Sequence, residues 1–472
     1  MEEQEPPAGI PLSDWQATPM SVRVLLLTLL EQVLDLKARV NQHSSNSSKP
    51  PSSDPPSAPP RPSKTPRGRK AGGQEGHDGK TRELVPSEQV DQIVPVRPHT
   101  CPECQTALSP DLSDALPIIR SQSWEVPPVT PIITEYQHHT VCCPHCQTLV
   151  YDPRRPTGAP PGGFGARATA LCALLRGEYH LSERNVASLM QTLYAFPLSL
   201  GSVSRCCERT SEALEPIYIT IAECAREQSV ANVDETSWKQ AGKRQWLWTM
   251  VTSVATLFVV AASRGAGALS TLLGKTFDGI VGSDRAKAYN SLADERRQVC
   301  WSHLDRNVAA LAEYNHTQSG WARALLNEID EVWKHWKAYR EGAIGRAGLQ
   351  QALLPIQVAI RTRLETGLKN PWHRISGMSK ELLEHWPALW TFVTTEGVEP
   401  TNNAAERALR PAVLWRKSSF GTRCDAGSRF VERMLTVSTT CGQQQRELFP
   451  FLVQALEAHW ASQPAPSLVS TR

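Results

Sequence analysis

The order of apolar runs between residues 229 and 301 constrains the fold more than any other feature of this 472-residue chain. Three runs rich in β-branched and aromatic residues come first and predict strands that pair with their neighbours. A helical stretch, a fourth strand, a second helical stretch and a fifth strand follow. The strands are expected at 230–233, 245–253, 255–262, 277–282 and 298–301, and the first helix at 264–273.

Two aspartates directly follow predicted strands of this region. Asp234 comes after the first strand and Asp284 after the fourth. The strand order is that of the ribonuclease-H-like fold, in which these two strands are neighbours, so the carboxylates would lie side by side. Close carboxylates repel each other unless cations neutralise them. A pair of Mg²⁺ ions, which prefer oxygen ligands, can clamp a phosphodiester between such groups. A single Asp at a strand end is more often a solvated turn residue.

A third carboxylate is expected from the segment 399–411. Thr401 or Asn402 would cap a short helix on which Asn402, Glu406 and Arg410 share one face. A carboxylate between an amide and a guanidinium group suits a metal ion and a phosphate. The stretch before it, about 306–398, is predicted to be a helical insertion with a tryptophan-rich core, and a helical tail is expected to run to about residue 460.

Two cysteine pairs predict a zinc site. Cys101-Pro-Glu-Cys104 and Cys143-Pro-His-Cys146 are separated by 38 residues, and four thiolates from two such turns fit one tetrahedral zinc ion. Five other Cys and His residues near the pairs could also bind zinc. We interpret them as bystanders, because the pairs already supply four sulfurs; they are Cys142, His99, His138, His139 and His145. Between the pairs, residues 132–141 are predicted to form a strand.

The N-terminal part contains a helix and a segment that cannot form a core. Apolar residues from 19 to 42 repeat at spacings of three and four, which indicates either a leucine-zipper-like coiled coil or an ordinary amphipathic helix. Residues 43–70 hold eight Ser and eight Pro, a composition typical of a disordered tether. The end of that segment carries five cations and no acid, so it is either a DNA-binding arm or a solvated linker; these residues are Arg61, Lys64, Arg67, Arg69 and Lys70.

Residues 166–225 are predicted to form three helices. Ser182 would cap the second helix, and the third would open at Leu200 after a turn. This arrangement resembles a helix-turn-helix whose recognition helix would present Ser202, Ser204 and Arg205 to DNA. Packing of three helices without a role in DNA binding is the alternative.

Charge and hydropathy exclude several classes of protein. The net charge is only +3, so a DNA-binding surface must come from local segregation of charge. The longest apolar run, 250–262, is too short to span a bilayer, and the acidic, Pro-rich start is unlike a secretory signal. Membrane, secreted and fibrous classes are therefore excluded. The expected location is the cytoplasm.

Six features of the sequence resemble the bacterial insertion-sequence transposases of the IS66 family. They are residues 41–54 and 69–77, the C-P-x-C pair, Val233-Asp-Glu-Thr236, Cys300-Trp-Ser-His303 and Asn402-Asn-Ala-Ala-Glu-Arg-Ala-Leu-Arg410. The resemblance spans about residues 20–460. It implies a leucine-zipper-like N-terminus, a zinc finger, a helical DNA-binding segment and a DDE catalytic domain. On that match Asp234, Asp284 and Glu406 are the DDE residues, and Cys300 and His303 form a C-x-x-H signature. Relatives more often have Gly where Arg285 follows the second Asp.

The sequence therefore predicts a transposase of mixed α+β, multidomain architecture. It would use two Mg²⁺ (or Mn²⁺) ions held by Asp234, Asp284 and Glu406, assisted by His303, and one structural Zn²⁺. Partners would be the transposon ends and target DNA, with Arg410 near a phosphate, further copies of the chain, and accessory proteins encoded beside it. Glu235, on the opposite face of the strand from Asp234, is expected to be dispensable for activity. The alternatives are a DNA-binding regulator without catalysis and a nuclease without strand transfer.

The predicted boundaries follow from these segments. They are 19–42 for the zipper-like helix, 43–84 for the linker, 85–150 for the zinc finger, 166–225 for the DNA-binding helices, 229–420 for the catalytic domain and 421–472 for the tail.

Overall fold

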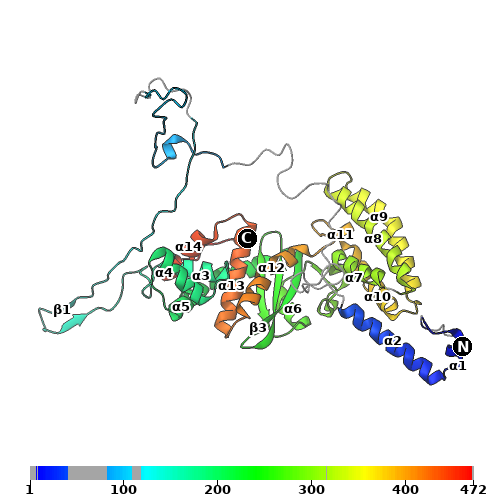
Figure 1. Ribbon diagram of the computed structural model, residues 1–472. Coiled ribbons are helices and arrows are strands. Elements are labelled where there is room, and N and C mark those ends of the chain that lie inside the picture. The colour runs from blue at the N-terminus through cyan, green and yellow to red at the C-terminus, as the bar shows by residue number, and fades with distance from the viewer. Residues whose placement is uncertain (1–6, 8, 41–81, 109–118, 315, 470–472) are drawn as a thin grey trace. The chain divides into compact units, whose positions relative to one another are not determined.

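The computed structural model describes residues 7, 9–40, 82–108, 119–314 and 316–469 (Figure 1). It divides into two compact units, residues 60–130 and the remainder, and each is described by itself. Within the described residues the fold is mixed α+β, with fourteen α-helices and two sheets. The predicted basic residues between 61 and 70 lie outside the described residues.

The N-terminal elements of the larger unit are α1 (Leu12–Ala17), α2 (Met20–Val40), β1 (Thr140–Cys142) and β2 (Leu149–Tyr151). Helix α2 confirms the helix expected from the apolar repeat. Apolar side chains such as Leu25 (57 % exposed), Leu29 (47 %) and Leu36 (56 %) are accessible along it. The strand expected over 132–141 is confined to β1, which pairs antiparallel with β2.

Three helices follow, as the sequence predicts: α3 (Ala166–Gly177), α4 (Glu183–Tyr194) and α5 (Leu200–Arg226). Ser182 caps α4, because its hydroxyl accepts a hydrogen bond from the Asn185 amide at 3.1 Å. The three helices share a small apolar core that includes Val186, Met190 and Val203.

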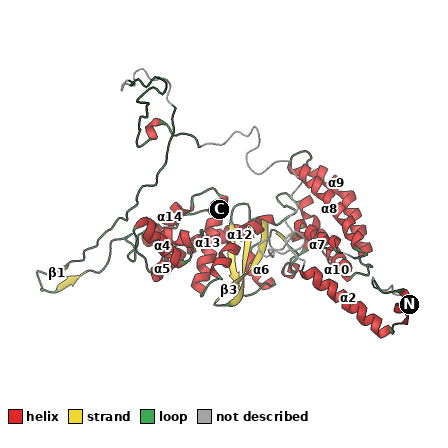
Figure 2. Cartoon of the chain, viewed as in Figure 1, coloured by secondary structure: helices red, strands yellow, loops and turns green. Residues whose placement is uncertain are grey.

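A five-stranded sheet forms the centre of the larger unit, with strand order β5-β4-β3-β6-β7 (Figure 2). Its strands are β3 (Val230–Gln240), β4 (Lys243–Val251), β5 (Thr256–Ala261), β6 (Ile280–Ser283) and β7 (Arg297–Val299). The first three strands are antiparallel, whereas β6 runs parallel to β3 and β7 parallel to β6. The predicted adjacency of the first and fourth strands of this region is therefore confirmed.

Two sequence expectations about the sheet are wrong. Strand β3 does not end before Asp234 but continues to Gln240, where Ala241 and Gly242, both with positive φ, make a two-residue turn into β4. The helix expected between the fourth and fifth strands is replaced by two short 3₁₀-helices, Lys287–Ser291 and Asp294–Arg296.

Helices cover both faces of the sheet. One face packs on α6 (Ala266–Leu273) through residues such as Val233 and Trp248. The other packs on α5, α12 (Asn403–Ser419) and α13 (Asp425–Gln443) through residues such as Trp238 and Phe258. Because side chains alternate along a strand, Asp234 belongs to the α12 face and Glu235 to the α6 face.

The predicted helical insertion lies between β7 and α12. It contains α7 (Trp301–Glu313), α8 (Ser319–Arg340), α9 (Arg346–Gly367), α10 (His373–Glu384) and α11 (Trp386–Thr394). Its core includes Trp301, Trp336, Trp372 and Trp390, as expected for apolar tryptophans. The tail, α13 and α14 (Leu448–Trp460), ends where the sequence predicts. No helix in the described part of the chain is long and apolar enough to cross a membrane.

Side chains of α13 bond to the outer edge of the sheet. Strand β5 is the edge strand, and its backbone N–H groups at residues 256, 258 and 260 meet oxygens of α13. The acceptors are Thr440 Oγ1 at 3.2 Å, Thr436 Oγ1 at 3.0 Å and Glu432 Oε1 at 2.6 Å, in that order. One face of the helix, at positions i, i+4 and i+8, thus takes the place of a sixth strand.

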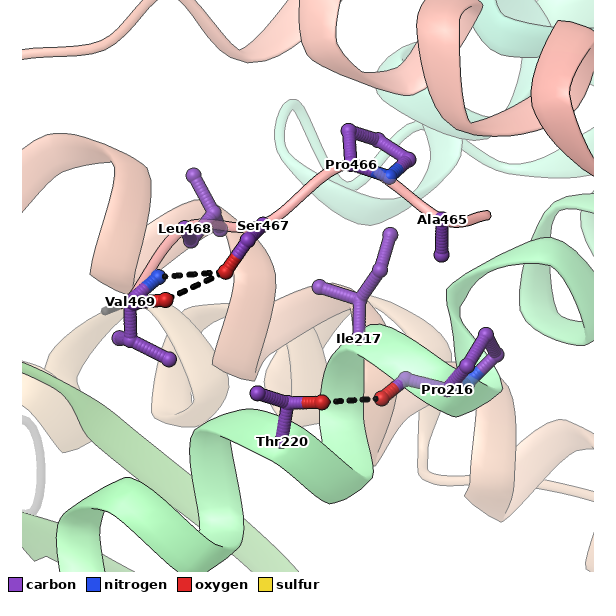
Figure 3. Close-up of a pocket in the computed structure, with 8 residues that line it drawn as sticks. All are labelled: Pro216, Ile217, Thr220, Ala465, Pro466, Ser467, Leu468 and Val469. Carbon is purple, nitrogen blue, oxygen red and sulfur yellow. Dashed lines mark hydrogen bonds between the residues drawn. The ribbon is translucent and has the colours of Figure 1, made fainter. Parts of the chain in front are cut away.

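A small pocket lies where the chain after α14 crosses α5 (Figure 3). Its lining is mainly apolar, and Thr220 donates its hydroxyl to the Pro216 carbonyl at 3.0 Å. None of the residues that the sequence singles out for catalysis or binding lines this pocket, so it is not the candidate site.

Candidate active site

The first two predicted acids lie on neighbouring strands. Asp234 is inside β3, and Asp284 directly follows the end of β6. The parallel register pairs Asn232 with Gly282, two residues before each acid. The two carboxylates are thus neighbours, although only Asp284 stands at a strand end as the sequence suggested.

The third acid is brought to this place by contacts between α7 and the start of α12. The Cys300 amide donates to the Ser283 carbonyl at 2.8 Å, which ties the start of α7 to the end of β6. The Trp301 backbone N–H donates to the Pro400 carbonyl at 2.8 Å, and the Asn402 backbone N–H donates to Cys300 Sγ at 3.4 Å. Cys300 therefore connects the end of β6 to the helix that carries Glu406.

Glu406 lies in the first turn of α12 and contacts two cationic or titratable side chains of α7. His303 Nε2 and Arg306 Nη2 are each 3.4 Å from Glu406 Oε1. Burial, and after it the neighbouring Arg306, lowers the pKa of His303, so the imidazole is neutral at neutral pH. His303, predicted to be catalytic, thus lies where it can orient Glu406.

The α12 face of the sheet contains poorly compensated polar groups. Burial raises the pKa of Asp234 well above its usual range, and the charges of Glu235 and Asp284 raise it further. Asn402 is fully buried, and neither atom of its side-chain amide has a hydrogen-bond partner among the described residues. The same holds for His303 Nδ1. A half-buried acid beside unpaired buried donors and acceptors is typical of a site that completes its contacts with a ligand.

The face shared by Asn402, Glu406 and Arg410 is only partly as expected. Asn402 precedes α12 and is buried, Glu406 is half-buried, and Arg410 is exposed. The helix has 17 residues instead of being short, and Asn402 makes no side-chain cap. These three residues therefore become more exposed along the helix, from the buried Asn402 to the exposed Arg410.

Glu235, expected to be dispensable, is held in an ion-paired cluster on the opposite face. Its side chain is fully buried; Oε1 accepts from Arg264 Nε at 2.5 Å and Oε2 from the Tyr289 hydroxyl at 2.6 Å. Arg264 also reaches toward Asp284, with Nη2 3.9 Å from Oδ2. The opposite orientation from Asp234 is confirmed, but Glu235 is linked to the second acid. Sequence reasoning missed both partners of Glu235, Arg264 and Tyr289.

The cation that follows Asp284 is directed elsewhere. Arg285 Nη1 lies 3.2 Å from Glu381 Oε2 of α10, and Nη2 donates to Asn307 Oδ1 at 2.8 Å. Its charge is therefore paired with the helical insertion.

The chemistry of the three predicted acids suits divalent cations. Asp234, Asp284 and Glu406 offer oxygen ligands, and in the described residues Asp234 has no ion-pair partner that would compensate its burial. The described residues contain no ready group of three or more His, Cys, Asp or Glu side chains placed to hold a metal. Mg²⁺ coordination consequently stays a prediction.

The two cysteine turns have the same local geometry. In each, the first Cys amide donates to the Thr carbonyl five residues on at 2.9 Å, and the Gln after the second Cys adopts a positive φ. The hydroxyls of Thr106 and Thr148 bond the second thiols and lower the pKa of both Cys104 and Cys146 to about 7. Each turn thus offers one readily ionised sulfur beside a second cysteine, which fits zinc. The turns belong to different units, and a four-sulfur centre stays a prediction.

The residues predicted to bind DNA differ in their surroundings. Arg205 is exposed on α5, whereas Ser202 contacts Ser199 and Ser204 donates to Glu183 of α4 at 3.0 Å. The Ser204 hydroxyl therefore helps dock α4 on α5.

Comparison with known proteins identifies the family. Residues 162–429 match the profile described as Transposase IS66 family, which covers more than half of the chain. The chain belongs to the IS66 transposase family. Its residues 18–83 match a family of unknown function, DUF6444.

A curated relative of this IS66 transposase is an uncharacterized protein, y4qI, of Sinorhizobium fredii. It is 28 % identical over 200 residues, which is 38 % of this chain and 36 % of the relative. The chain thus matches about a third of that protein's length. All three predicted acids lie within the matched transposase region.

Proposed function

We propose that this IS66 transposase is a DDE enzyme that cuts DNA at the ends of its element and joins them to a target. The observation that carries the proposal is the convergence of Asp234, Asp284 and Glu406 from β3, the end of β6 and the start of α12. The carboxylates of Asp284 and Glu406 both act on the pKa of Asp234, so all three belong to one electrostatic site. The sheet order supports a ribonuclease-H-like catalytic domain.

In this proposal the three acids would hold two Mg²⁺ or Mn²⁺ ions, which activate the attacking oxygen and stabilise the leaving oxygen of a phosphodiester. The chain's own residues position these ligands. His303 and Arg306 orient Glu406, and Cys300 holds the start of α12 against the end of β6. The reaction needs no covalent intermediate on a side chain, because water attacks first and the freed 3′-hydroxyl attacks the target next.

The test uses a donor plasmid that carries the gene with its flanking DNA. Asp284→Asn and Glu406→Gln remove charge but keep shape, and we expect both to abolish excision and strand transfer while retaining DNA binding in a shift assay. Glu331→Gln, an exposed carboxylate of α8, is the matched control and should behave as wild type. Full excision by Asp284→Asn would refute the triad. Binding without cleavage by the wild type would indicate a regulator, and cleavage without joining a nuclease.

We also propose that Cys101, Cys104, Cys143 and Cys146 hold one structural zinc ion. Zinc would fold the surrounding region, because a four-thiolate site has no open position for chemistry. Cys143→Ser should lose zinc by elemental analysis, whereas Cys142→Ser should keep it. Zinc loss only in the Cys142 variant would overturn the assignment.

A further inference from the structure

Cations gather on the α6 face of the β3–β4 hairpin. The register places Lys239 directly opposite Arg244, and both side chains are exposed. Like charges at directly opposed positions of an antiparallel pair destabilise a hairpin. An anion bound over this pair would relieve the repulsion.

The next residue of β4 on this face is aromatic, and two guanidinium groups lie over its ring. Trp246 lies opposite Ser237, one step closer to Glu235 along the same face. The guanidinium carbon of Arg244 is 4.9 Å from the centre of its ring, and that of Arg264 is 5.1 Å away. The ring thus fixes two arginines that would otherwise sample many rotamers.

A buried ion pair holds the half-exposed side chain of Arg264 in place. The fully buried Glu235 accepts from its Nε, and the buried Tyr289 hydroxyl holds the other oxygen of Glu235. The Arg264 side chain nevertheless remains 46 % exposed, with Nη2 3.9 Å from Asp284 Oδ2. Burial of the Glu235 carboxylate costs free energy. In this position the carboxylate orients the half-exposed guanidinium of Arg264 beside Asp284, a proposed catalytic acid.

We propose that Lys239, Arg244, Trp246 and Arg264 form a phosphate track, which binds the backbone of one DNA strand as it enters the acidic site. Arg264 binds the phosphate next to the scissile one, and Lys239 and Arg244 bind phosphates farther along the strand. The track rests on the proposed function, because its inner end is Asp284. An arginine fork matches the geometry of phosphate oxygens, and a row of cations that ends at carboxylates selects a polyanion with one reacting group.

The first test measures binding of the full chain to a random-sequence duplex of about 30 base pairs by fluorescence anisotropy, without divalent metal, over a range of KCl concentrations. Each lost phosphate contact should reduce the slope of log K against log salt by about 0.9. We expect the triple variant Lys239→Gln, Arg244→Gln, Arg264→Gln to flatten the slope by about two to three. Arg361→Gln, an exposed arginine of α9, is the control and should leave it unchanged. An unchanged slope in the triple variant overturns the track, and would leave an acidic protein segment as the occupant of this face.

The second test separates the track from the acid cage. On end duplexes cut from the donor plasmid, Arg244→Gln should raise KM several-fold with little change in kcat, whereas Arg264→Gln should also lower kcat. Arg264→Lys keeps the charge but loses the planar fork, so it should restore the salt slope but not kcat. Full recovery of kcat by the lysine would overturn the placement of Arg264 beside the scissile phosphate. A wild type that never cleaves would refute the proposed function alone, because the salt slope tests the track independently.

Discussion

Asp234 and Glu235 are adjacent acids on one strand, yet their environments are opposite. Asp234 faces α12, where burial and other carboxylates raise its pKa and the described residues supply no cation to pair with it. Glu235 faces α6, where Arg264 and Tyr289 satisfy both oxygens at 2.5 and 2.6 Å. The folded chain thus holds a carboxylate without a cationic partner directly beside a carboxylate that is ion-paired.

These two environments separate an acid that is available to bind a metal ion from an acid that positions another residue. Burial alone does not do so, because burial raises the pKa of both acids. What separates them is whether the protein itself provides the partner. Among the described residues Asp234 accepts a hydrogen bond from the Glu235 backbone amide and pairs with no cation, whereas Glu235 binds Arg264 and Tyr289.

The largest expected contrast is in activity. Asp234→Asn should lower the rate of excision by about three orders of magnitude or more, which corresponds to roughly 4 kcal/mol of lost transition-state stabilisation. Glu235→Gln should lower the rate by about tenfold, the usual effect of changing a residue that orients a site from behind. Both rates are measured on the donor plasmid at equal protein concentration. Equal losses in the two variants would remove the distinction.

Stability in the absence of divalent metal should change by different amounts in the two variants. A raised folded-state pKa means that Asp234 lowers the free energy of unfolding as pH rises above the unfolded value of about 4. Asp234→Asn should therefore stabilise the protein at neutral pH by about 1–3 kcal/mol. The raised pKa of Glu235 acts in the same direction, but Glu235→Gln also breaks the ion pair with Arg264, so its gain should be smaller. Urea unfolding at pH 7.5 measures both. A destabilised Asp234→Asn protein would contradict this view of the α12 face.

Added Mg²⁺ should reproduce the effect of removing the charge. An ion that binds only the folded state raises the free energy of unfolding, by about 2.7 kcal/mol at a hundred times its dissociation constant. The effect should be larger at pH 8 than at pH 5, because the ligands must be deprotonated. Thermal melts with and without Mg²⁺ test this for wild type and Asp234→Asn. An equal gain in the variant would place the ion elsewhere.

Glu432 offers the smallest contrast, away from the site. Burial raises its pKa to about 6, and its Oε1 accepts from the Val260 amide. Glu432→Gln keeps an acceptor and removes the buried charge, so it should raise the free energy of unfolding by about 1–2 kcal/mol at pH 8. The gain should shrink as pH falls through 6 and vanish near pH 4, where the wild-type carboxyl is protonated as well. A pH series of urea midpoints measures it, and activity should be unchanged.

Local patterns sufficed for much of the fold. The β-branched runs located the strands, Ser182 marked the start of α4, and the two acids of neighbouring strands were identified from strand order alone. The end of β3 was missed because Ala241-Gly242 lacks the Asn or Asp that usually marks such a turn. The 3₁₀-helices after Asp284 were read as an α-helix because a short apolar spacing is common to both.

The partners of Glu235 could not be found in this way. Arg264 and Tyr289 lie 29 and 54 residues further along the chain, and no spacing rule connects side chains across that distance. One signal was present in the sequence. Glu235 shares the parity of Ala231 and Val233, so a charged residue stood on an inward-facing row, and a buried charge requires a partner.

The side-chain caps of α13 on β5 limit how copies of this chain can associate. With the N–H groups of residues 256, 258 and 260 already bonded, a strand from another molecule finds no free donors there. The opposite edge is covered by α11, where the Thr391 hydroxyl donates to the Arg297 carbonyl of β7 at 2.6 Å and the Phe392 amide donates to the Gln298 side chain at 2.7 Å. A strand from another molecule is thereby hindered from extending this five-stranded sheet at either edge. In the proposed transposase, copies that meet on DNA would associate through other surfaces or through the nucleic acid itself, and such contacts can form and separate without unravelling the sheet.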